Sequence, residues 1–247
     1  MKSIIIILIS VISLSSFSSK DNLPCKKRKK DNEKEIIKSN INGNGYQIEL
    51  EFTTGKGHNN PSFALWVENM NEEFTQELFV TQAVATGIFR YGDSSSGKWE
   101  AGQKMYKATL PYFIHKRSDN AEIPTTDKPI IDAHTGATPQ SDFILKTKTN
   151  VKTNSKFRLV LEINQAWDTN NYWHNAKYPN EKEYRNSCQP SLIYAVTIDP
   201  NNLMEEYTLN PIGHGHYAGH NGKLYTDIST FTTALKIAES IKLKVSK

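Results

Sequence analysis

Alternation between apolar and polar residues is the feature that most restricts the folds available to this chain. In segment 46–53, YQIELEFT, every second residue is apolar, and segment 156–164, KFRLVLEIN, has the same period. Successive side chains of a β-strand point to opposite faces of a sheet, so this period predicts strands with at least one buried face. The alternation therefore favours a fold built mainly from β-sheet.

Other short segments share this strand character and are separated by polar, turn-prone residues. They are segments 62–68, 77–81, 143–147, 191–198 and 207–212. The first two are joined by NMNEE and are predicted to form a hairpin. Many short strands with polar turns are typical of an antiparallel sandwich or barrel, and we expect a mainly β, antiparallel β-sandwich of the immunoglobulin-like type.

Near the C-terminus the period changes. Ala234, Ile237, Ala238 and Ile241 recur at the i, i+3, i+4, i+7 spacing of an amphipathic helix. One C-terminal helix is therefore predicted, packed across an end or a face of the sheet.

The first residues have the pattern of an export signal. Lys2 precedes an apolar run over residues 4–14, which is too short to span a bilayer and is followed by a serine-rich stretch. We therefore expect residues 1–19 to be a cleaved signal peptide and the protein to be periplasmic or secreted. A buried N-terminal helix is the alternative. No later segment is long and apolar enough to predict a transmembrane span.

Composition helps to divide the rest of the chain. Residues 20–44 are charged, with few large apolar side chains, and are predicted to be a flexible leader before a single β-sandwich domain over residues 45–247. The net charge is +4, and the basic run 26–30 alone contributes five positive charges, so no nucleic-acid surface is expected on the nearly neutral body. Whether Cys25 and Cys188 pair stays open.

Segment 132–139, DAHTGATP, is the first of two segments that could carry chemistry. Gly136 allows a tight turn or the close approach of another surface. Pro139 favours an extended conformation for Thr138, which can then present its hydroxyl group on an exposed loop. A strand-connecting turn with its own hydrogen bonds is the alternative interpretation.

The pattern of this segment, D-x-x-[ST]-G-A-[ST], resembles the attachment motif for covalently bound FMN. In exported proteins with this motif, a periplasmic FMN transferase links FMN through a phosphoester to the last Thr or Ser. The resemblance implies that Thr138 is the acceptor in this chain. The other motif positions are occupied by Asp132, Thr135, Gly136 and Ala137.

The second segment, 213–222, is GHGHYAGHNG and holds three of the seven histidines. If the chain is extended here, His214 and His216 point the same way, and His220 could close on them. Three imidazoles are a suitable donor set for a Zn²⁺, Cu²⁺ or Fe ion. The glycines of the segment favour the alternative of a flexible, polar surface loop without a metal.

Weaker candidates lie elsewhere, partly in the polar stretches 84–104 and 165–188, which are predicted to be loops. The cluster 115–117, HKR, could meet a phosphate group or could be a solvated strand end. Aromatic side chains could form platforms for sugars or flavin rings, or could fix loops to the sandwich. The tryptophans in question are Trp66, Trp99, Trp167 and Trp173.

Several segments together resemble an exported bacterial family that is catalogued as domain of unknown function 2271. The matching segments, in order, are 61–69, 77–87, 110–117, 132–139, 157–164, 189–196 and 212–237. The resemblance implies a small β-sandwich. It also implies a redox context, because genes of this family tend to occur near genes for periplasmic FMN transferase and other redox proteins.

These observations predict an exported redox accessory protein that carries covalently attached FMN on Thr138 and transfers electrons outside the cytosol. Its expected partners are a periplasmic FMN transferase and a redox partner. We expect an electron carrier or a binding protein rather than a stand-alone enzyme, because the flavin itself supplies the redox chemistry. The alternatives are a non-enzymatic metal- or ligand-binding β-sandwich and an adhesion or carbohydrate-binding module.

Overall fold

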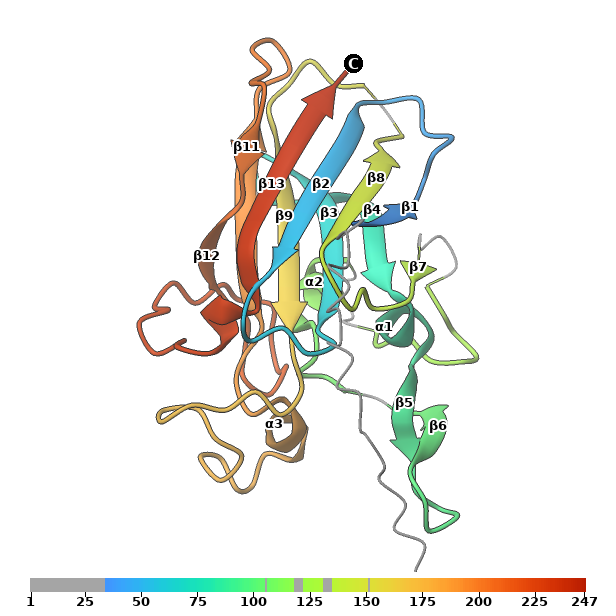
Figure 1. The fold of residues 1–247 in the computed structure, drawn as a ribbon, viewed down its shortest axis with the longest axis vertical. Helices are drawn as coiled ribbons and strands as arrows, with labels where there is room; N and C mark the ends of the chain where they lie inside the picture. The colour runs from blue at the N-terminus through green and yellow to red at the C-terminus, as the bar shows by residue number, and fades with distance from the viewer. Residues whose placement is uncertain (1–33, 105, 118–121, 131–134, 151) are drawn as a thin grey trace, which may run out of the picture. The chain divides into compact units, whose positions relative to one another are not determined.

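The computed structural model describes residues 34–104, 106–117, 122–130, 135–150 and 152–247 (Figure 1). Within it, Lys34–Lys247 form one compact unit. The predicted signal peptide, residues 1–19, lies outside the described residues, as do Cys25, Asp132 and His134.

Two large sheets make up most of this unit. The five-stranded sheet has the order β1 (Glu35–Lys38), β8 (Phe143–Lys148), β2 (Gln47–Thr54), β13 (Ala238–Ser246) and β11 (Tyr207–Thr208). The six-stranded sheet has the order β12 (Asn210–His214), β10 (Leu192–Ile198), β9 (Phe157–Asn164), β3 (Ser62–Asn69), β4 (Phe74–Thr81) and β7 (Thr135–Gly136). Neighbouring strands are antiparallel except in the pairs β1–β8 and β4–β7, which are parallel.

Smaller elements connect the strands. A hairpin is formed by β5 (Ile88–Asp93) and β6 (Glu100–Gln103), and it extends from the end of the sheets (Figure 1). The helical elements are α1 (Gln82–Thr86), α2 (Pro111–Arg117), α3 (Lys182–Ser187) and the 3₁₀ helix η1 (Ala234–Lys236).

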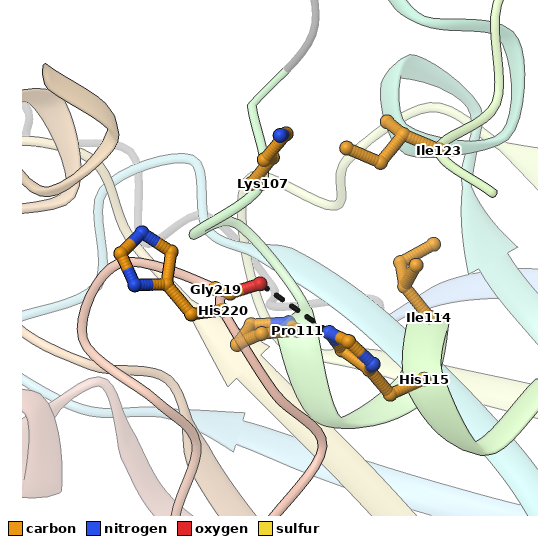
Figure 2. A pocket seen from close by; sticks show the side chains of 7 residues that line it. All are labelled: Lys107, Pro111, Ile114, His115, Ile123, Gly219 and His220. Carbon is orange, nitrogen blue, oxygen red and sulfur yellow. Dashed lines mark hydrogen bonds between the residues drawn. The ribbon is translucent and has the colours of Figure 1, made fainter. Parts of the chain in front are cut away.

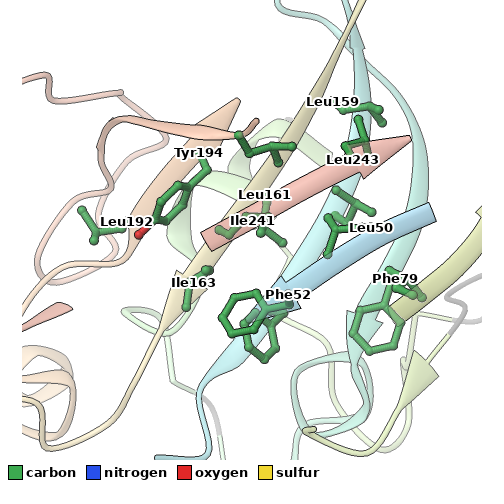
Figure 3. Close-up of a cluster of buried hydrophobic side chains, with 14 of the residues drawn as sticks. Leu50, Phe52, Phe79, Leu159, Leu161, Ile163, Leu192, Tyr194, Ile241 and Leu243 are labelled. Carbon is green, nitrogen blue, oxygen red and sulfur yellow. The ribbon is translucent and has the colours of Figure 1, made fainter. Parts of the chain in front are cut away.

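The main hydrophobic core lies between the two sheets (Figure 3). Leu50 and Phe52 of β2 face this core from one side, and Leu159 and Leu161 of β9 face it from the other. These residues come from alternate positions of their strands, as the period of two requires. The structure is therefore mainly β, with antiparallel sheets arranged consistently with a β-sandwich.

A second apolar cluster covers the other face of the six-stranded sheet. Trp66 of β3 and Val160 of β9 belong to it, together with Tyr112 and Phe113 of α2. Both faces of the central strands are consequently buried, which explains why β3 and β9 are buried at nearly every position. The predicted hairpin over segments 62–68 and 77–81 is confirmed as β3 and β4, with a turn at residues 70–73.

The predicted C-terminal helix is wrong. Only one 3₁₀ turn forms at Ala234–Lys236, and Ile241 lies in the strand β13. Beyond this turn, Ile241, Leu243 and Val245 are buried while the lysines between them are exposed. This period of two, together with pairing to β2, outweighs the short helical pattern before it.

Four further expectations also need correction. The predicted leader over residues 20–44 contains β1, so its last residues belong to the folded unit. The predicted loop over 84–104 contains the hairpin β5–β6, and the predicted loop over 165–188 ends in α3. The cluster 115–117 closes the helix α2 rather than a strand.

Among the residues that the structure describes, no helix has the length and apolar character needed to cross a membrane.

Candidate functional site

Buried polar side chains collect at one end of the six-stranded sheet. Because β4, β9 and β12 run in the same direction, their last residues lie at this end, next to the first residues of β3 and β10. The helices α1, α2 and α3 lie at this end as well (Figure 1). The buried polar side chains here are those of Thr81, Glu162, Asn164, Ser187, Gln189 and Ser191.

Glu162 is the most unusual of these residues because its carboxylate is completely buried. It accepts hydrogen bonds from the backbone N–H groups of Tyr112 (3.1 Å) and Phe113 (2.7 Å) and from the Ser191 hydroxyl. No described lysine, arginine or histidine forms an ion pair with it. Burial raises the pKa of Glu162 to about 7, although the three hydrogen bonds act in the opposite direction. Glu162 therefore fixes the first turn of α2 to the sheet.

Segment 213–222 packs closely over this end instead of forming a loose loop. Gly219 has a φ of +73°, and a Cβ atom on it would lie 2.1 Å from the Lys107 carbonyl oxygen. A Cβ atom on Gly222 would lie 2.3 Å from the Cβ of His115. The glycines that favoured a flexible loop in the sequence thus allow the backbone to contact α2 and the residues before it.

Two of the three predicted histidines come together, and α2 supplies another. The rings of His216 and His220 stack with centroids 5.0 Å apart. His115 of α2 donates from Nε2 to the Gly219 carbonyl oxygen over 3.3 Å. His220 also contacts Glu181, because its Nε2 atom lies 3.3 Å from a carboxylate oxygen of that residue. Burial, followed by the neighbouring His220, lowers the pKa of His216.

His214 is directed elsewhere. Its Nδ1 donates to the Gly215 carbonyl oxygen over 2.7 Å, and its ring stacks on Tyr225 at 5.2 Å. The rings of Phe231 and Trp173 lie 4.9 Å and 6.3 Å away. Burial among these rings lowers the pKa of His214.

The described part of the chain contains no group of three or more His, Cys, Asp or Glu side chains that could hold a metal ion. The structure therefore does not support a shared site of His214, His216 and His220. A tighter arrangement of the same residues is required before a metal could bind to all three.

A cleft of about 320 Å³ opens beside the histidines (Figure 2). One wall is apolar and is formed by Ile114 of α2 and Ile123. Lys107 lies across the cleft from Ile123, His115 lies beside Ile114 on α2, and segment 213–222 borders the far side with Gly219 and His220. The residues around the cleft are Lys107, Pro111, Ile114, His115, Ile123, Gly219 and His220.

The predicted flavin acceptor, Thr138, follows β7. This strand forms the edge of the six-stranded sheet opposite to β12. Strand β7 pairs with the last residues of β4, and Gly136 packs against the Phe79 ring so closely that a Cβ atom would lie 3.1 Å from it. Ala137 is exposed, Thr138 is partly exposed and Pro139 is buried. Within the described residues, the Thr138 hydroxyl forms no hydrogen bond, and only its carbonyl oxygen accepts one, from Gln140.

The two candidate sites are separate. Strands β12 and β7 are the two edges of the six-stranded sheet, with four strands between them. Five strand spacings correspond to about 24 Å. Thr138 and His214 are therefore at opposite edges of the sheet, whereas His216 and His220 lie in the part of segment 213–222 that packs beside α2.

The aromatic candidates divide by burial. Trp66 and Trp173 are buried, and Trp173 Nε1 donates to Thr230, so both have structural roles. Trp99 and Trp167 are 66% and 63% exposed, which leaves them accessible to a partner. Cys188 is a buried thiol without a disulfide among the described residues.

No family model matches the chain, and neither the curated proteins nor the solved structures that were compared contain a match. The resemblance to domain of unknown function 2271 therefore stays a prediction.

Sequence reasoning missed Lys107 and Glu162 as site residues. Glu162 carried a signal, because it is the carboxylate within the otherwise apolar run LVLEI.

Proposed function

We propose that the protein is an exported redox accessory protein that carries FMN in phosphoester linkage to Thr138. The placement of Thr138 supports this proposal. Its hydroxyl is partly exposed beside an edge strand and makes no hydrogen bond to a described residue, so a modifying enzyme can reach it without breaking structure. A turn held by the threonine side chain, the alternative interpretation, would require such a bond.

The flavin would supply the electron-transfer chemistry, while the chain would hold it in place outside the cytosol. A covalent tether is useful there because it keeps the cofactor at an effective concentration of about millimolar. The partners in this proposal are a periplasmic FMN transferase and a redox partner, and the location is the periplasm or the exterior.

Co-expression with an FMN transferase in an exporting host tests the proposal. We expect the intact mass to rise by roughly 440 Da, the mass of the nucleotide less water. Thr138→Ala should abolish the adduct and leave the melting temperature unchanged, because no side-chain hydrogen bond is lost. Thr138→Ser should keep it, since serine has the same nucleophilic oxygen. Thr135→Ala should give partial labelling.

The same mass spectrum reports export, because loss of the signal peptide places the mature N-terminus near residues 18–22. An unmodified peptide around Thr138, obtained while a control substrate is fully flavinylated, would disprove the carrier proposal. A chain that still begins at Met1 in the envelope fraction would disprove export.

The cleft beside the histidines supports a second candidate, a non-enzymatic binding module on a β-sandwich of immunoglobulin-like type. For a metal ligand, we expect stoichiometric metal in the purified protein. We also expect the metal to be lost, with a lower melting temperature, when His216 and His220 are both replaced by alanine, because a ligand stabilises only the folded state to which it binds. Metal analysis at background level in the unaltered protein would reject the metal and leave an organic ligand.

A further inference from the structure

We propose that the cleft beside α2 binds a small organic anion, whose apolar body lies against Ile114 and Ile123 and whose oxyanion group is held by Lys107. This inference rests on the second candidate function and is independent of flavin attachment to Thr138. It is based on three features of the cleft, which are its apolar wall, a lysine that has no ion-pair partner among the described residues, and its closely packed backbone.

The apolar wall can accept a hydrocarbon or aromatic group. Ile114 is only 7% exposed, because it belongs to the apolar cluster between α2 and the six-stranded sheet, and Ile123 packs against the same cluster. Pro111 adds a further apolar surface at the base of the cleft. Burial of a small apolar group on such a surface contributes about 25 cal/mol for each Å² removed from water.

The opposite side of the cleft carries a cation, Lys107. The Lys107 ammonium forms no ion pair with any described residue. Its neighbours in the basic cluster 115–117 differ in this respect, because Lys116 donates to the Glu72 carbonyl oxygen over 2.8 Å and Arg117 lies 3.5 Å from Glu77. The side chains of Lys116 and Arg117 thus already have partners, whereas the Lys107 ammonium is available to bind an oxyanion.

Two imidazoles extend this basic side. His115 uses Nε2 to donate a hydrogen bond to the Gly219 carbonyl oxygen. His220 lines the cleft from the other side.

Two nearby carboxylates contact residues that line the cleft. Glu181 lies beside His220, and Glu183 accepts the backbone N–H of Lys107 over 3.1 Å. Neither belongs to the described residues that line the cleft, and these have basic and apolar side chains but no acidic one.

The backbone around the cleft is held in place before any ligand arrives. Gly219 contacts the Lys107 carbonyl group and Gly222 contacts His115, which leaves no room for movement of segment 213–222 toward α2. A site that is formed in advance loses little conformational entropy when a ligand binds.

Two dyes with the same ring system test the proposal. 8-Anilino-1-naphthalenesulfonate is an anion, and N-phenyl-1-naphthylamine lacks the sulfonate. We expect the anionic dye to bind at one site, at least tenfold more tightly than the neutral dye. Shifts of the Ile114 and Ile123 methyl signals in NMR spectra of the exported chain should locate it.

Three variants separate the contributions. Lys107→Met should weaken the anionic dye about tenfold and leave the neutral dye unchanged, while Ile123→Ser should weaken both. Lys104→Met is the matched control, because it removes an exposed lysine from the same connection but not from the cleft, and it should change neither. Displacement of the dye by hexanoate or by hexyl phosphate shows whether the site prefers a carboxylate or a phosphate.

Equal binding of the two dyes at the isoleucine methyls, with no effect of Lys107→Met, would overturn the anion proposal but keep an apolar binding module. No methyl shift with either dye, hexanoate or hexyl phosphate would overturn the binding function of this cleft as well. Both results would leave the flavin proposal for Thr138 untouched.

Discussion

At the scale of single residues, Glu162 combines two properties that rarely occur together. Its carboxylate is fully buried, and the groups that contact it are two backbone N–H groups and the Ser191 hydroxyl rather than a cation. Those donors stabilise the charged form, but the loss of hydration outweighs them, so the pKa rises to about 7. The proton on Glu162 is therefore linked to folding in the neutral pH range.

The stability of the protein should consequently depend on pH through this residue. The folded state holds the proton more tightly than the unfolded state, so the contribution of Glu162 is fully present below about pH 4.5 and is lost as the pH rises through 7. A shift from 4.5 to about 7 corresponds to about 3 kcal/mol. Glu162→Gln does not titrate, so its stability relative to the unaltered protein should improve by most of this amount between pH 5 and pH 8.

Urea unfolding of both proteins at the two pH values, followed by tryptophan fluorescence, measures this difference directly. The comparison cancels the other acidic groups, including Asp142 and Asp199, whose lowered pKa values act in the opposite sense. If the free-energy difference between the proteins is the same at pH 5 and pH 8, Glu162 does not titrate between them.

Gly219 provides a second prediction at this scale. Gly219→Ala adds a methyl group 2.1 Å from the Lys107 carbonyl oxygen at a residue with a φ of +73°. Gly97→Ala is a matched control, because Gly97 has a φ of +81° but nothing within 4 Å of the added atom. We expect a cost of about 1 kcal/mol for Gly97→Ala, from backbone strain alone, and about 3 kcal/mol for Gly219→Ala.

Chemical denaturation of the two glycine variants separates strain from close packing. Equal losses would show that segment 213–222 moves away from Lys107 at little cost. In that case the anionic dye should also bind more weakly to Gly219→Ala, because the wall of the cleft has shifted.

At the scale of elements, the sequence predicted the strands whose burial is regular. Strands β2 and β8 were recognisable because buried positions alternate with more exposed ones along them. Strand β13 was not recognised, because Ala234 and Ile237 just before it have the spacing of an α-helix. In the structure this spacing corresponds only to one 3₁₀ turn. Such a pattern cannot show that β2 is available as a pairing partner for the residues after Ile237.

The short strands β1 and β7 illustrate the same limit. β1 has four residues and lies in a charged stretch, and β7 has two. Both pair in parallel with strands that are distant in the sequence, so they depend on a tertiary context that local patterns do not contain.

The candidate site was predicted in part. The sequence identified segment 213–222 and the basic cluster 115–117, but not their contact. That contact depends on Gly219 and Gly222, whose missing side chains make room for Lys107 and His115. Composition could only suggest that these glycines are flexible, because the surface they pack against comes from a remote part of the chain.

At the scale of the whole folded unit, the six-stranded sheet separates two possible functions. The proposed flavin acceptor lies two residues after the edge strand β7, and the cleft lies beside α2, which packs on the central strands β3 and β9. Residues more than about 10 Å apart without shared partners usually contribute independently. Variants of Thr138 and Lys107 should therefore be interpretable separately, and a loss of one function need not affect the other.

The N-terminal boundary of this unit gives the last prediction. Strand β1 closes one edge of the five-stranded sheet, and the hydroxyl of Ser39, the next residue, donates to the Leu78 carbonyl oxygen of β4 in the other sheet over 2.8 Å. Ile37 packs against the main core. A chain that begins at Lys34 should therefore be as stable as one that begins at Lys20. A chain that begins at Gly45 should lose about 3 kcal/mol, from several hydrogen bonds at about 1 kcal/mol each.

Two substitutions within the chain that begins at Lys34 show whether β1 acts through packing. Ile37→Ser should lower the free energy of unfolding by about 1–2 kcal/mol, because its side chain contacts the core. Ile36→Ser should leave it nearly unchanged, since Ile36 is 57% exposed. Equal unfolding midpoints for the chains that begin at Lys34 and Gly45 would mean that β1 adds nothing to the fold and that the domain begins where the sequence pattern alone placed it. A loss confined to the shorter chain and to Ile37→Ser would establish β1 as the strand that joins the two sheets at this edge.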